Sequence, residues 1–345
     1  MARPTIADLA VAAGVSMSTV DRVLNGRDPV RPATAQRVMQ AAEEIGFYAA
    51  SVIRYRLQSN KTKRRFGFLL LQGNRRFYRN LADALRQAAA NHTGANISTE
   101  VVFMEGLTPG AVAEQILELG QKVDALGLVA AEHPLVTRAI EQLRAQGVPS
   151  FALISSLTAE NGIGYFGLDA WKVGRTAAWA FAKLCHKPGK IGILIGSHRF
   201  RCQEMNEIGF RSYFREHASD FHLLEPMSSV ENKHVAAELV TELLEKEPEL
   251  AGLYVAGGGI TGAMAALRDM GRSQDVTVVG YELMDETKIG LLDGTLNLII
   301  SHPLQRLAEM SVQAMLTATV EGVDRSKEAL PSVKLPFEIY TPENL

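Results

Sequence analysis

The sequence predicts an N-terminal domain made of helices, followed by an α/β body built from two doubly wound lobes. Residues 5–25 contain two short helical patterns separated by Gly14, a residue that commonly ends a helix. From Phe66 onward, short apolar runs alternate with helical patterns in greater number than one modest sheet holds. With 345 residues, 47% of them hydrophobic, the chain is long enough for two or three domains.

The first two helices carry matching start and stop signals. Thr5 can cap the first helix, Gly14 supplies the backbone conformation that ends it, and Ser16 is placed to cap the second. The second helix presents an outward face that is small and mostly polar, which could approach the edges of bases but would also suit an ordinary hairpin with a solvated face. The shared apolar seam consists of Ile6, Leu9, Ala10, Val15, Val20, Val23 and Leu24.

A third helix and a local excess of positive charge follow. Pro32 suits the first helical position, Gly46 ends the helix, and Val38, Ala41, Ala42 and Ile45 share one face. Residues 1–65 contain 11 Lys/Arg and 5 Asp/Glu, whereas the whole chain has 36 and 38. A basic end on an acidic body is what binding to DNA phosphates requires, and this segment is too apolar to be a disordered tail.

These residues resemble the helix-turn-helix of the LacI/GalR transcriptional regulators. The resemblance runs from Thr5 to Asn25 and continues through Val30, Arg37-Val38 and Ile45-Gly46-Phe47. It implies that the second helix lies in the major groove of a near-palindromic operator in double-stranded DNA. Asp21 departs from the Ser that is usual in the family. The residues expected to contact DNA in the helix pair are Thr5, Ser16, Met17, Ser18, Thr19, Arg22 and Asn25.

The segment that follows corresponds to the family's hinge helix, which orders on DNA and inserts a Leu into the minor groove. Arg54 and Leu57 are the expected contacts here, although Leu57 stands one place later than in the family pattern. Two alternatives stay open: the arginines grip the groove without a wedge, or the segment is a disordered basic linker. The expected boundaries are a headpiece at 1–48, a hinge at 49–65 and a sensor domain at 66–345.

The body is predicted to contain a series of buried parallel strands. Helical patterns separate several of them, at Arg79–Asn91 and after Thr108-Pro109, for example. A ligand of such a fold lies at the carboxyl ends of the strands, in the crevice between the lobes. The predicted strands are Phe66–Leu71, Ser98–Met104, Ala125–Val129, Ser150–Ile154, Tyr165–Leu168, Lys190–Ile195, Gly252–Val255, Val276–Tyr281 and Leu296–Ile300.

The body also resembles the type I periplasmic-binding-protein fold, closest to the ribose-type sugar binders. The resemblance implies that the chain crosses between the lobes three times, near Phe166–Asp169, Tyr281–Leu298 and Ser326–Leu335. The first lobe is then expected at about 66–167 and 299–328, and the second at about 168–298 and 329–345.

Ligand contacts in the first lobe are expected after its first strand. Phe77 or Tyr78 would stack on a sugar, and Asn74 would form hydrogen bonds with hydroxyl groups. The aromatic pair could instead form a hydrophobic staple at the start of the next helix. Asp169 matches an Asp-Asn pair of relatives, with Ala170 replacing the Asn, and the Asp could equally cap the following helix.

The corresponding positions in the second lobe are Arg201, Glu204, Asn206, Gly257, Glu282 and His302. Gly257 belongs to the turn Ala256–Gly262, which replaces the family's Asn-Asp pair. This turn could attract an anion, but it lacks the Lys-Ser/Thr of a Walker motif. The charged groups on the loop and helix from His198 onward could also form a solvated face.

Together the sequence predicts a ligand-responsive, sequence-specific DNA-binding regulator, with repression as the favoured direction. The effector is expected to be a sugar, cyclitol or sugar derivative, and the nearby arginines leave a phosphorylated or acidic sugar open. A homodimer or tetramer is expected, in keeping with a near-palindromic operator. The expected location is the cytoplasm, because the sequence shows no signal peptide or membrane-spanning run.

No metal site is expected, since Cys185 and Cys202 lack a ligand-like spacing. No cofactor and no catalysis are expected, because the sequence offers no nucleophile–base spacing. Two other functions fit parts of the sequence. One is a transport receptor, against which the basic headpiece argues. The other is an enzyme that uses Glu204, Glu282 or His302 as acid and base.

Overall fold

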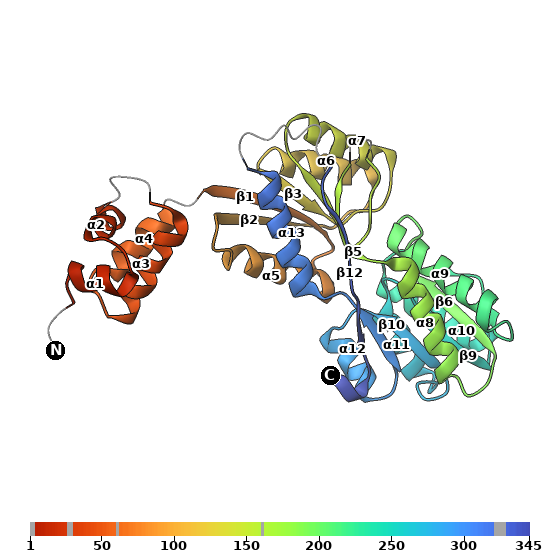
Figure 1. The fold of residues 1–345 in the computed structure, drawn as a ribbon. Coiled ribbons are helices and arrows are strands. Elements are labelled where there is room, and N and C mark those ends of the chain that lie inside the picture. The colour runs from red at the N-terminus through yellow and green to blue at the C-terminus, as the bar shows by residue number, and fades with distance from the viewer. Residues whose placement is uncertain (1–3, 26–29, 60–61, 160–161, 321–328) are drawn as a thin grey trace. The chain divides into compact units, whose positions relative to one another are not determined.

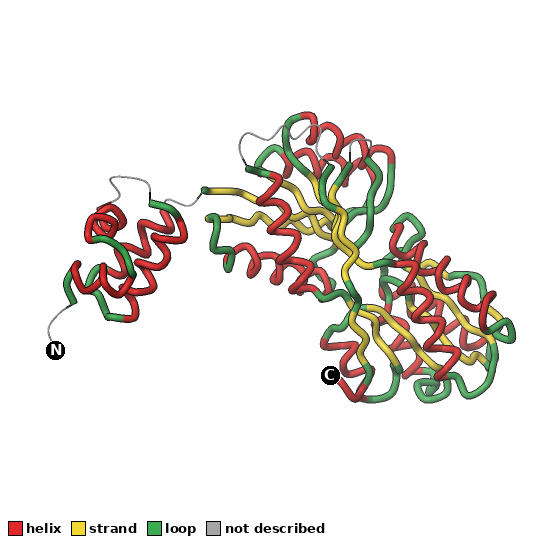
Figure 2. The backbone as a smooth tube through the Cα atoms, viewed as in Figure 1, coloured by secondary structure: helices red, strands yellow, loops and turns green. Residues whose placement is uncertain are grey.

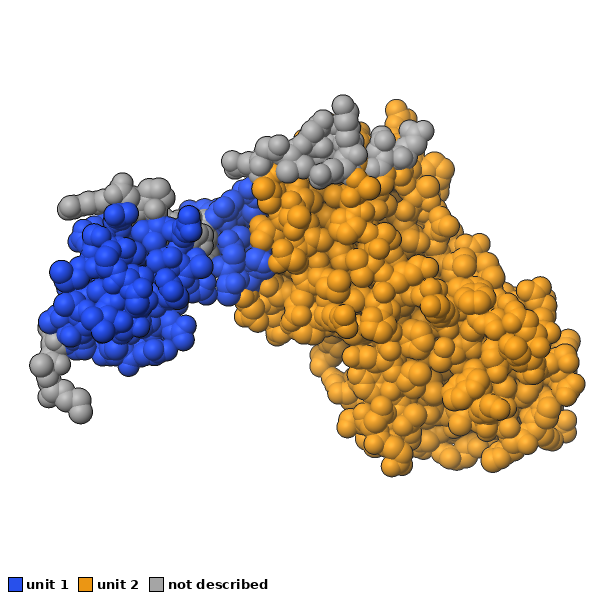
Figure 3. Space-filling view, viewed as in Figure 1, with its two compact units in different colours: residues 1–64, 92–97 blue, residues 65–91, 98–345 orange. Residues whose placement is uncertain are grey.

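The computed structural model describes residues 4–25, 30–59, 62–159, 162–320 and 329–345. The chain divides into two compact units, which Figure 3 colours separately: residues 1–64 with 92–97, and residues 65–91 with 98–345.

Helices form the first unit and enclose one apolar core. They are α1 (Ile6–Ala13), α2 (Met17–Asn25), α3 (Pro32–Glu44) and α4 (Ala50–Ser59), labelled in Figure 1. Each contributes a side chain with no exposed surface, so the four helices form a single cooperative core. These side chains are Leu9, Val20, Val38 and Ile53. We call the domain formed by α1–α4 the headpiece.

The predicted helix signals in the headpiece are confirmed. Thr5 Oγ1 accepts a hydrogen bond from the backbone N–H of Asp8 at 3.3 Å, and Asp8 accepts one from the backbone N–H of Thr5 at 2.8 Å. Gly14 has φ of +63°, the left-handed conformation that ends α1. Ser16 Oγ accepts from the N–H of Thr19 at 3.3 Å, which caps α2.

Helix α4 occupies most of the segment expected to be a hinge. A hinge helix is expected within 49–65, and α4 (Ala50–Ser59) lies there, but Ile53 is fully buried among the apolar residues of the headpiece. The first half of α4 is therefore part of the headpiece core in this structure, and the headpiece extends beyond residue 48. Ile53 and Ala49 are apolar residues four positions apart, and both are buried against the other helices of the headpiece.

The second unit contains two sheets with helices on both faces, as Figure 2 shows. The first sheet has the order β12-β5-β4-β3-β1-β2, and its pairs β1–β3, β3–β4, β4–β5 and β5–β12 are parallel. Its strands are β1 (Lys63–Leu71), β2 (Asn96–Met104), β3 (Ala125–Leu128), β4 (Ser150–Leu153), β5 (Gly164–Leu168) and β12 (Ser332–Leu335). The helices that accompany it are α5 (Arg76–Ala90), α6 (Pro109–Gly120), α7 (Pro134–Ala145) and α13 (Leu304–Ala318).

The second sheet has the order β13-β11-β10-β9-β6-β7, with β8 paired to β6, and its pair β11–β13 is antiparallel. Its strands are β6 (Lys190–Ile195), β7 (His222–Leu223), β8 (Met227–Ser228), β9 (Leu250–Val255), β10 (Thr277–Tyr281), β11 (Leu298–Ser301) and β13 (Glu338–Tyr340). The helices of this part are α8 (Ala170–Leu184), α9 (Arg201–His217), α10 (Lys233–Lys246), α11 (Ile260–Asp269), α12 (Asp285–Leu292) and the short 3₁₀ helix η1 (Pro342–Asn344).

The chain passes between the sheets at three places, two of which differ from the expectation. The first passage follows β5, as expected. The second follows Ser301 instead of lying within 281–298, because β11 still pairs with β10. The third lies between Leu335 and Glu338 instead of within 326–335, because β12 pairs with β5. A short apolar run fits either sheet equally well, so its sequence does not reveal which sheet it joins.

We call residues 66–168 with 304–335 the first lobe, and residues 169–303 with 336–345 the second lobe. Among the helices of the described segments, none is both long and apolar enough to cross a membrane.

Candidate functional site

Helix α2 has one buried stripe and one exposed face. Val20 and Val23 point into the headpiece core, whereas Met17 is 58% exposed. Ser16 Oγ lies 2.9 Å from both Ser18 Oγ and Thr19 Oγ1, so three hydroxyl groups gather at the start of the helix. Of the residues expected to contact DNA in the helix pair, Thr19 is half-buried and the others are exposed: Thr5, Ser16, Met17, Ser18, Arg22 and Asn25.

Asp21, the departure from the family pattern, has a partner within α2. Asn25 Nδ2 donates a hydrogen bond to Asp21 Oδ1 at 2.6 Å. The pair is four residues apart, so both side chains lie on the same face of the helix. One donor of Asn25 is therefore used by the carboxylate that the sequence places beside it.

Of the two residues of α4 expected to contact DNA, the structure describes the side chain of Arg54 but not that of Leu57. Arg54 forms an ion pair with Glu43 of α3, and 56% of its side chain remains exposed. Leu57 lies in α4, but its side chain is outside the part of the chain that the structure describes.

A large cavity lies between the two lobes of the body. Its volume is about 740 Å³, and we call it the crevice. It is lined by the loop after β1 with the start of α5, by the turn between β9 and α11, and by residues that follow β8 and β10. These are carboxyl ends of strands from both sheets, the position at which doubly wound folds bind ligands.

A buried ion pair crosses the crevice. Arg75 of the first lobe donates a hydrogen bond to Glu231 Oε2 of the second, and the Glu231 side chain is only 3% exposed. Gln203 Nε2 donates to Glu231 Oε1 at 2.6 Å, while Gln203 Oε1 accepts from the N–H groups of Gly196 at 2.6 Å and Ser197 at 3.0 Å. Burial alone would lower the pKa of Arg75, but the Glu231 carboxylate outweighs it and leaves that pKa raised.

The glycine-rich turn lies against this network. A Cβ on Gly258 would lie 2.1 Å from Glu231 Oε2, and one on Gly257 would lie 2.3 Å from Gln203 Oε1. Side chains at these positions would displace the network. Glu231 itself has φ of +61°, an uncommon conformation for a residue other than glycine. The sequence of this turn is compatible with an anion site, but in the structure the Glu231 carboxylate of the protein itself lies beside the turn.

Glu282 and His302 form a second network at the crevice. Glu282 Oε1 lies 2.5 Å from His302 Nδ1, and Glu282 Oε2 accepts from the backbone N–H of His302 at 3.2 Å and from Ser301 Oγ at 3.1 Å. Glu282 lines the crevice with φ of +73°, whereas His302 is buried behind it, with its ring centroid 6.1 Å from that of Phe77. His302 therefore positions the carboxylate.

The aromatic residues predicted after β1 also line the crevice, together with Asn74. Phe77 and Tyr78 are mostly buried and meet edge to face, with ring centroids 5.0 Å apart. The Arg75 guanidinium lies 5.4 Å from the Tyr78 ring centroid. Burial raises the pKa of Tyr78, so its hydroxyl is a neutral hydrogen-bonding group.

Five of the expected ligand residues lie in the crevice lining and five do not. Asn74, Phe77, Tyr78, Gly257 and Glu282 line it.

The other five have different surroundings. Asp169 accepts from the N–H of Lys172 at 3.4 Å and pairs with Lys334, so it serves as the N-cap of α8. Arg201 donates to Thr158 Oγ1 at 2.9 Å, and Glu204 is exposed on α9. Asn206 is fully buried, and His302 lies behind Glu282.

The ion-pair network of the crevice consists of residues that were not among the expected ligand residues: Arg75, Gln203 and Glu231. Arg75 and Gln203 stand in segments that the resemblance had marked, one beside Asn74 and one beside Glu204. Glu231 had no comparable signal, because it follows a strand of only two residues.

Cys202 also lines the crevice, and burial raises the pKa of its thiol to about 12. In the described part of the chain, no three His, Cys, Asp or Glu side chains group closely enough to hold a metal ion.

Comparison with known proteins gives two family matches on consecutive parts of the chain. The family described as "Bacterial regulatory proteins, lacI family" matches residues 5–49, and "Periplasmic binding protein domain" matches residues 66–322. A regulator encoded in the aml 5′ region of Streptomyces limosus is 27% identical, covering 91% of this chain and 87% of the relative. Catabolite control protein A of Priestia megaterium is 24% identical, covering 95% and 96%.

A solved structure resembles the body. It is an ABC transporter solute-binding protein from Agrobacterium vitis with bound D-fucose, with a TM-score of 0.70 and 18% identity, covering 81% of this chain and 96% of that one. At this identity the likeness establishes the fold.

Proposed function

Because the chain belongs to the LacI family of bacterial regulatory proteins, with a periplasmic-binding-protein domain as its body, we propose that it is a transcriptional regulator whose operator affinity depends on an effector bound in the crevice. The observation that carries the proposal is the amphipathic character of α2. It buries Val20 and Val23 while exposing Met17, Ser18 and Arg22, which is what a helix entering the major groove requires.

On the DNA side, two copies of the chain read two halves of a near-palindromic operator. The chain then acts as a homodimer or a larger symmetric assembly in the cytoplasm, where its DNA is. Arg22 and the hydroxyl groups at the start of α2 contact DNA bases or phosphates, and Thr5 contacts the sugar–phosphate backbone of the DNA. Binding weakens steeply with salt, because each phosphate contact releases counterions.

The effector is a neutral polyhydroxylated molecule. The crevice offers the Glu282 carboxylate, the Asn74 amide and the aromatic faces of Phe77 and Tyr78, a set that suits hydroxyl groups and an apolar sugar face. Both arginines of the crevice lining are already paired, Arg75 with Glu231 and Arg76 with Asp285. A phosphorylated or acidic sugar that binds either arginine would have to displace a carboxylate of the protein. The resemblance to a D-fucose-bound protein also favours a sugar.

The effector acts by changing how the lobes approach each other. Contacts between the lobes include the Arg75–Glu231 pair, Arg201 with Thr158, and the backbone bond from the Glu132 N–H to the Arg199 carbonyl at 2.8 Å. A ligand that contacts both lobes favours their closed arrangement. Operator affinity and effector affinity are then linked, and the linkage is reciprocal. Repression is the favoured direction of regulation.

Catalysis is disfavoured by how the acid and base candidates are used. Glu282 and His302 bind each other, and Glu204 lies on the exposed face of α9. A transport receptor would have a body of the same fold as this chain, but a DNA-binding headpiece would have no role in such a protein.

The test combines a thermal-shift screen of the full chain against sugars and polyols with footprinting on the DNA upstream of its own gene. We expect salt-sensitive, twofold-symmetric protection that changes with the ligand found in the screen. Absence of such protection at low salt, with and without that ligand, would overturn the proposal.

A further inference from the structure

A second, smaller cavity adjoins the crevice. It has a volume of about 140 Å³ and lies at the ends of β1 and β2, where Leu71 and Met104 line it. It shares three lining residues with the crevice: Phe200, Val230 and Glu231. We call this cavity the annex. Because the two cavities share a wall, a ligand bound in the crevice lies next to the annex.

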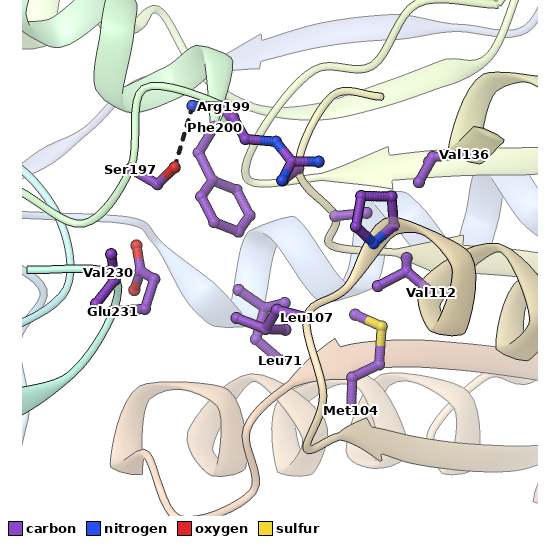
Figure 4. A pocket seen from close by; sticks show the side chains of 13 residues that line it. Leu71, Met104, Leu107, Val112, Val136, Ser197, Arg199, Phe200, Val230 and Glu231 are labelled. Atoms are coloured by element: carbon purple, nitrogen blue, oxygen red, sulfur yellow. Dashed lines mark hydrogen bonds between the residues drawn. The ribbon is translucent and has the colours of Figure 1, made fainter. Parts of the chain in front are cut away.

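The annex is mostly apolar. Figure 4 shows Leu71, Leu107, Met104 and Val112, which all belong to the first lobe, gathered on one side of it. Met104 has no exposed surface, and Leu71, Val112 and Val136 expose 1–5% of theirs. The polar residues Ser197, Arg199 and Glu231 come from the second lobe. The wall of the annex that the first lobe forms is therefore apolar, and the charged groups lie on the side that the second lobe forms.

Two of the three polar side chains at the annex, those of Glu231 and Ser197, already form hydrogen bonds within the protein. Glu231 accepts hydrogen bonds from Arg75 and Gln203, and Ser197 Oγ accepts one from the N–H of Arg199 at 3.3 Å. Ordered water in a cavity needs two to four polar partners, and this lining offers few. By contrast, an apolar cavity of roughly 150 Å³ is large enough for a benzene ring. Size and lining thus agree on an apolar group about as large as one ring.

We propose that the annex binds an apolar, ring-sized substituent of the effector, so that the effector is a glycoside or related polyol instead of a free sugar. This proposal depends on the effector being bound in the crevice as described above. The hydroxylated part lies in the crevice, and the substituent passes Phe200 and Val230. Val230 lines both cavities, is 63% exposed and has φ of +46°.

The expected effect is a preference for a substituent of the right size. Burying one ring instead of one methyl group removes several CH₂ equivalents from water, which tightens binding at least about tenfold. The probes are the methyl and phenyl glycosides, in both anomeric forms, of D-glucose, D-galactose, D-fucose and D-ribose. Binding to the full chain is measured by titration calorimetry. For at least one sugar, a phenyl glycoside is expected to bind at least about tenfold more tightly than its methyl counterpart.

A cavity-filling variant tests whether the annex supplies that preference. Ala131 is half-buried and lines the annex, so Ala131→Phe fills it, with Ala131→Leu as a milder version. Ala113 has the same class of exposure in the same lobe but lies outside the annex lining, which makes Ala113→Phe the matched control. We expect Ala131→Phe to abolish the preference for phenyl while binding of the methyl glycoside persists, and Ala113→Phe to retain the preference.

Several results would overturn the proposal: equal affinity for methyl and phenyl glycosides, equal effects of the Ala131 and Ala113 variants, or no binding by any glycoside of the panel. Thermal unfolding of each variant shows whether it is folded, and if Ala131→Phe is not, Ala131→Leu decides. Footprinting keeps the two proposals apart. DNA protection that responds to a free sugar, without any phenyl preference, removes the annex proposal alone. A phenyl preference without DNA binding removes the regulatory proposal alone.

Discussion

The ion pair between Arg75 and Glu231 is expected to be a strong link between the lobes, and replacing Glu231 with Gln tests it. The substitution keeps the shape of the side chain but leaves the Arg75 guanidinium, whose side chain is only 25% exposed, without its anion. Removing one partner of a buried pair costs about 3–5 kcal/mol. Because Arg75 keeps some contact with water, we expect a loss of about 2 kcal/mol in the free energy of unfolding.

A double-mutant cycle separates the interaction from other effects of each change. Urea unfolding of the full chain is measured for Arg75→Met, Glu231→Gln and the double variant, and the coupling energy is expected to be about 2 kcal/mol.

The chain provides a matched control in Arg76 and Asp285, which also join the lobes, at 2.6 Å, but with exposed side chains. Their cycle of Arg76→Met and Asp285→Asn is expected to give less than about 1 kcal/mol. Equal couplings in the two cycles, or additive effects at Arg75 and Glu231, would refute the reasoning.

Three further predictions concern single positions. Gly258→Ala would push a Cβ to within 2.1 Å of Glu231 Oε2, so we expect effector affinity in calorimetry to fall at least about tenfold, while Gly110→Ala, which meets nothing within 4 Å, leaves it unchanged; unchanged affinity in both would contradict this. Gly14→Ala is expected to lose about 1 kcal/mol of headpiece stability in thermal unfolding, because φ of +63° disfavours a Cβ although the space is open; a gain in stability would count against it. Burial raises the pKa of Cys202 to about 12, so at pH 8 its alkylation by iodoacetamide, followed by peptide mass spectrometry, should be more than about a hundredfold slower than that of a free cysteine and should rise with pH through pH 10; a rate that levels off near pH 9 would argue against the raised pKa.

The headpiece could be predicted closely because its signals are local. A capping hydroxyl at Thr5, a left-handed Gly14 and a second cap at Ser16 each act within four residues, so the sequence contains the whole arrangement. The end of the headpiece could not be predicted as closely from the sequence, because the burial of Ile53 depends on helices that approach α4 in space.

The body shows the same contrast between local and distant information. Strands such as Lys190–Ile195 were predicted with their observed bounds, since a continuous apolar run is a local property. Which sheet β11 or β12 belongs to depends on strand pairing, and the sequence of a single short apolar run does not determine that pairing. Glu231 illustrates the limit at the candidate site, because it meets Arg75 across 156 residues of chain and follows a strand too short to recognise.

The most direct test of the central claim is the linkage between the crevice and the headpiece. Operator affinity of the full chain is measured by fluorescence anisotropy with and without saturating effector, and effector affinity is measured by calorimetry with and without operator. The account predicts that each ligand changes the affinity of the other by the same factor. An operator affinity that stays unchanged while the effector fills the crevice would contradict it.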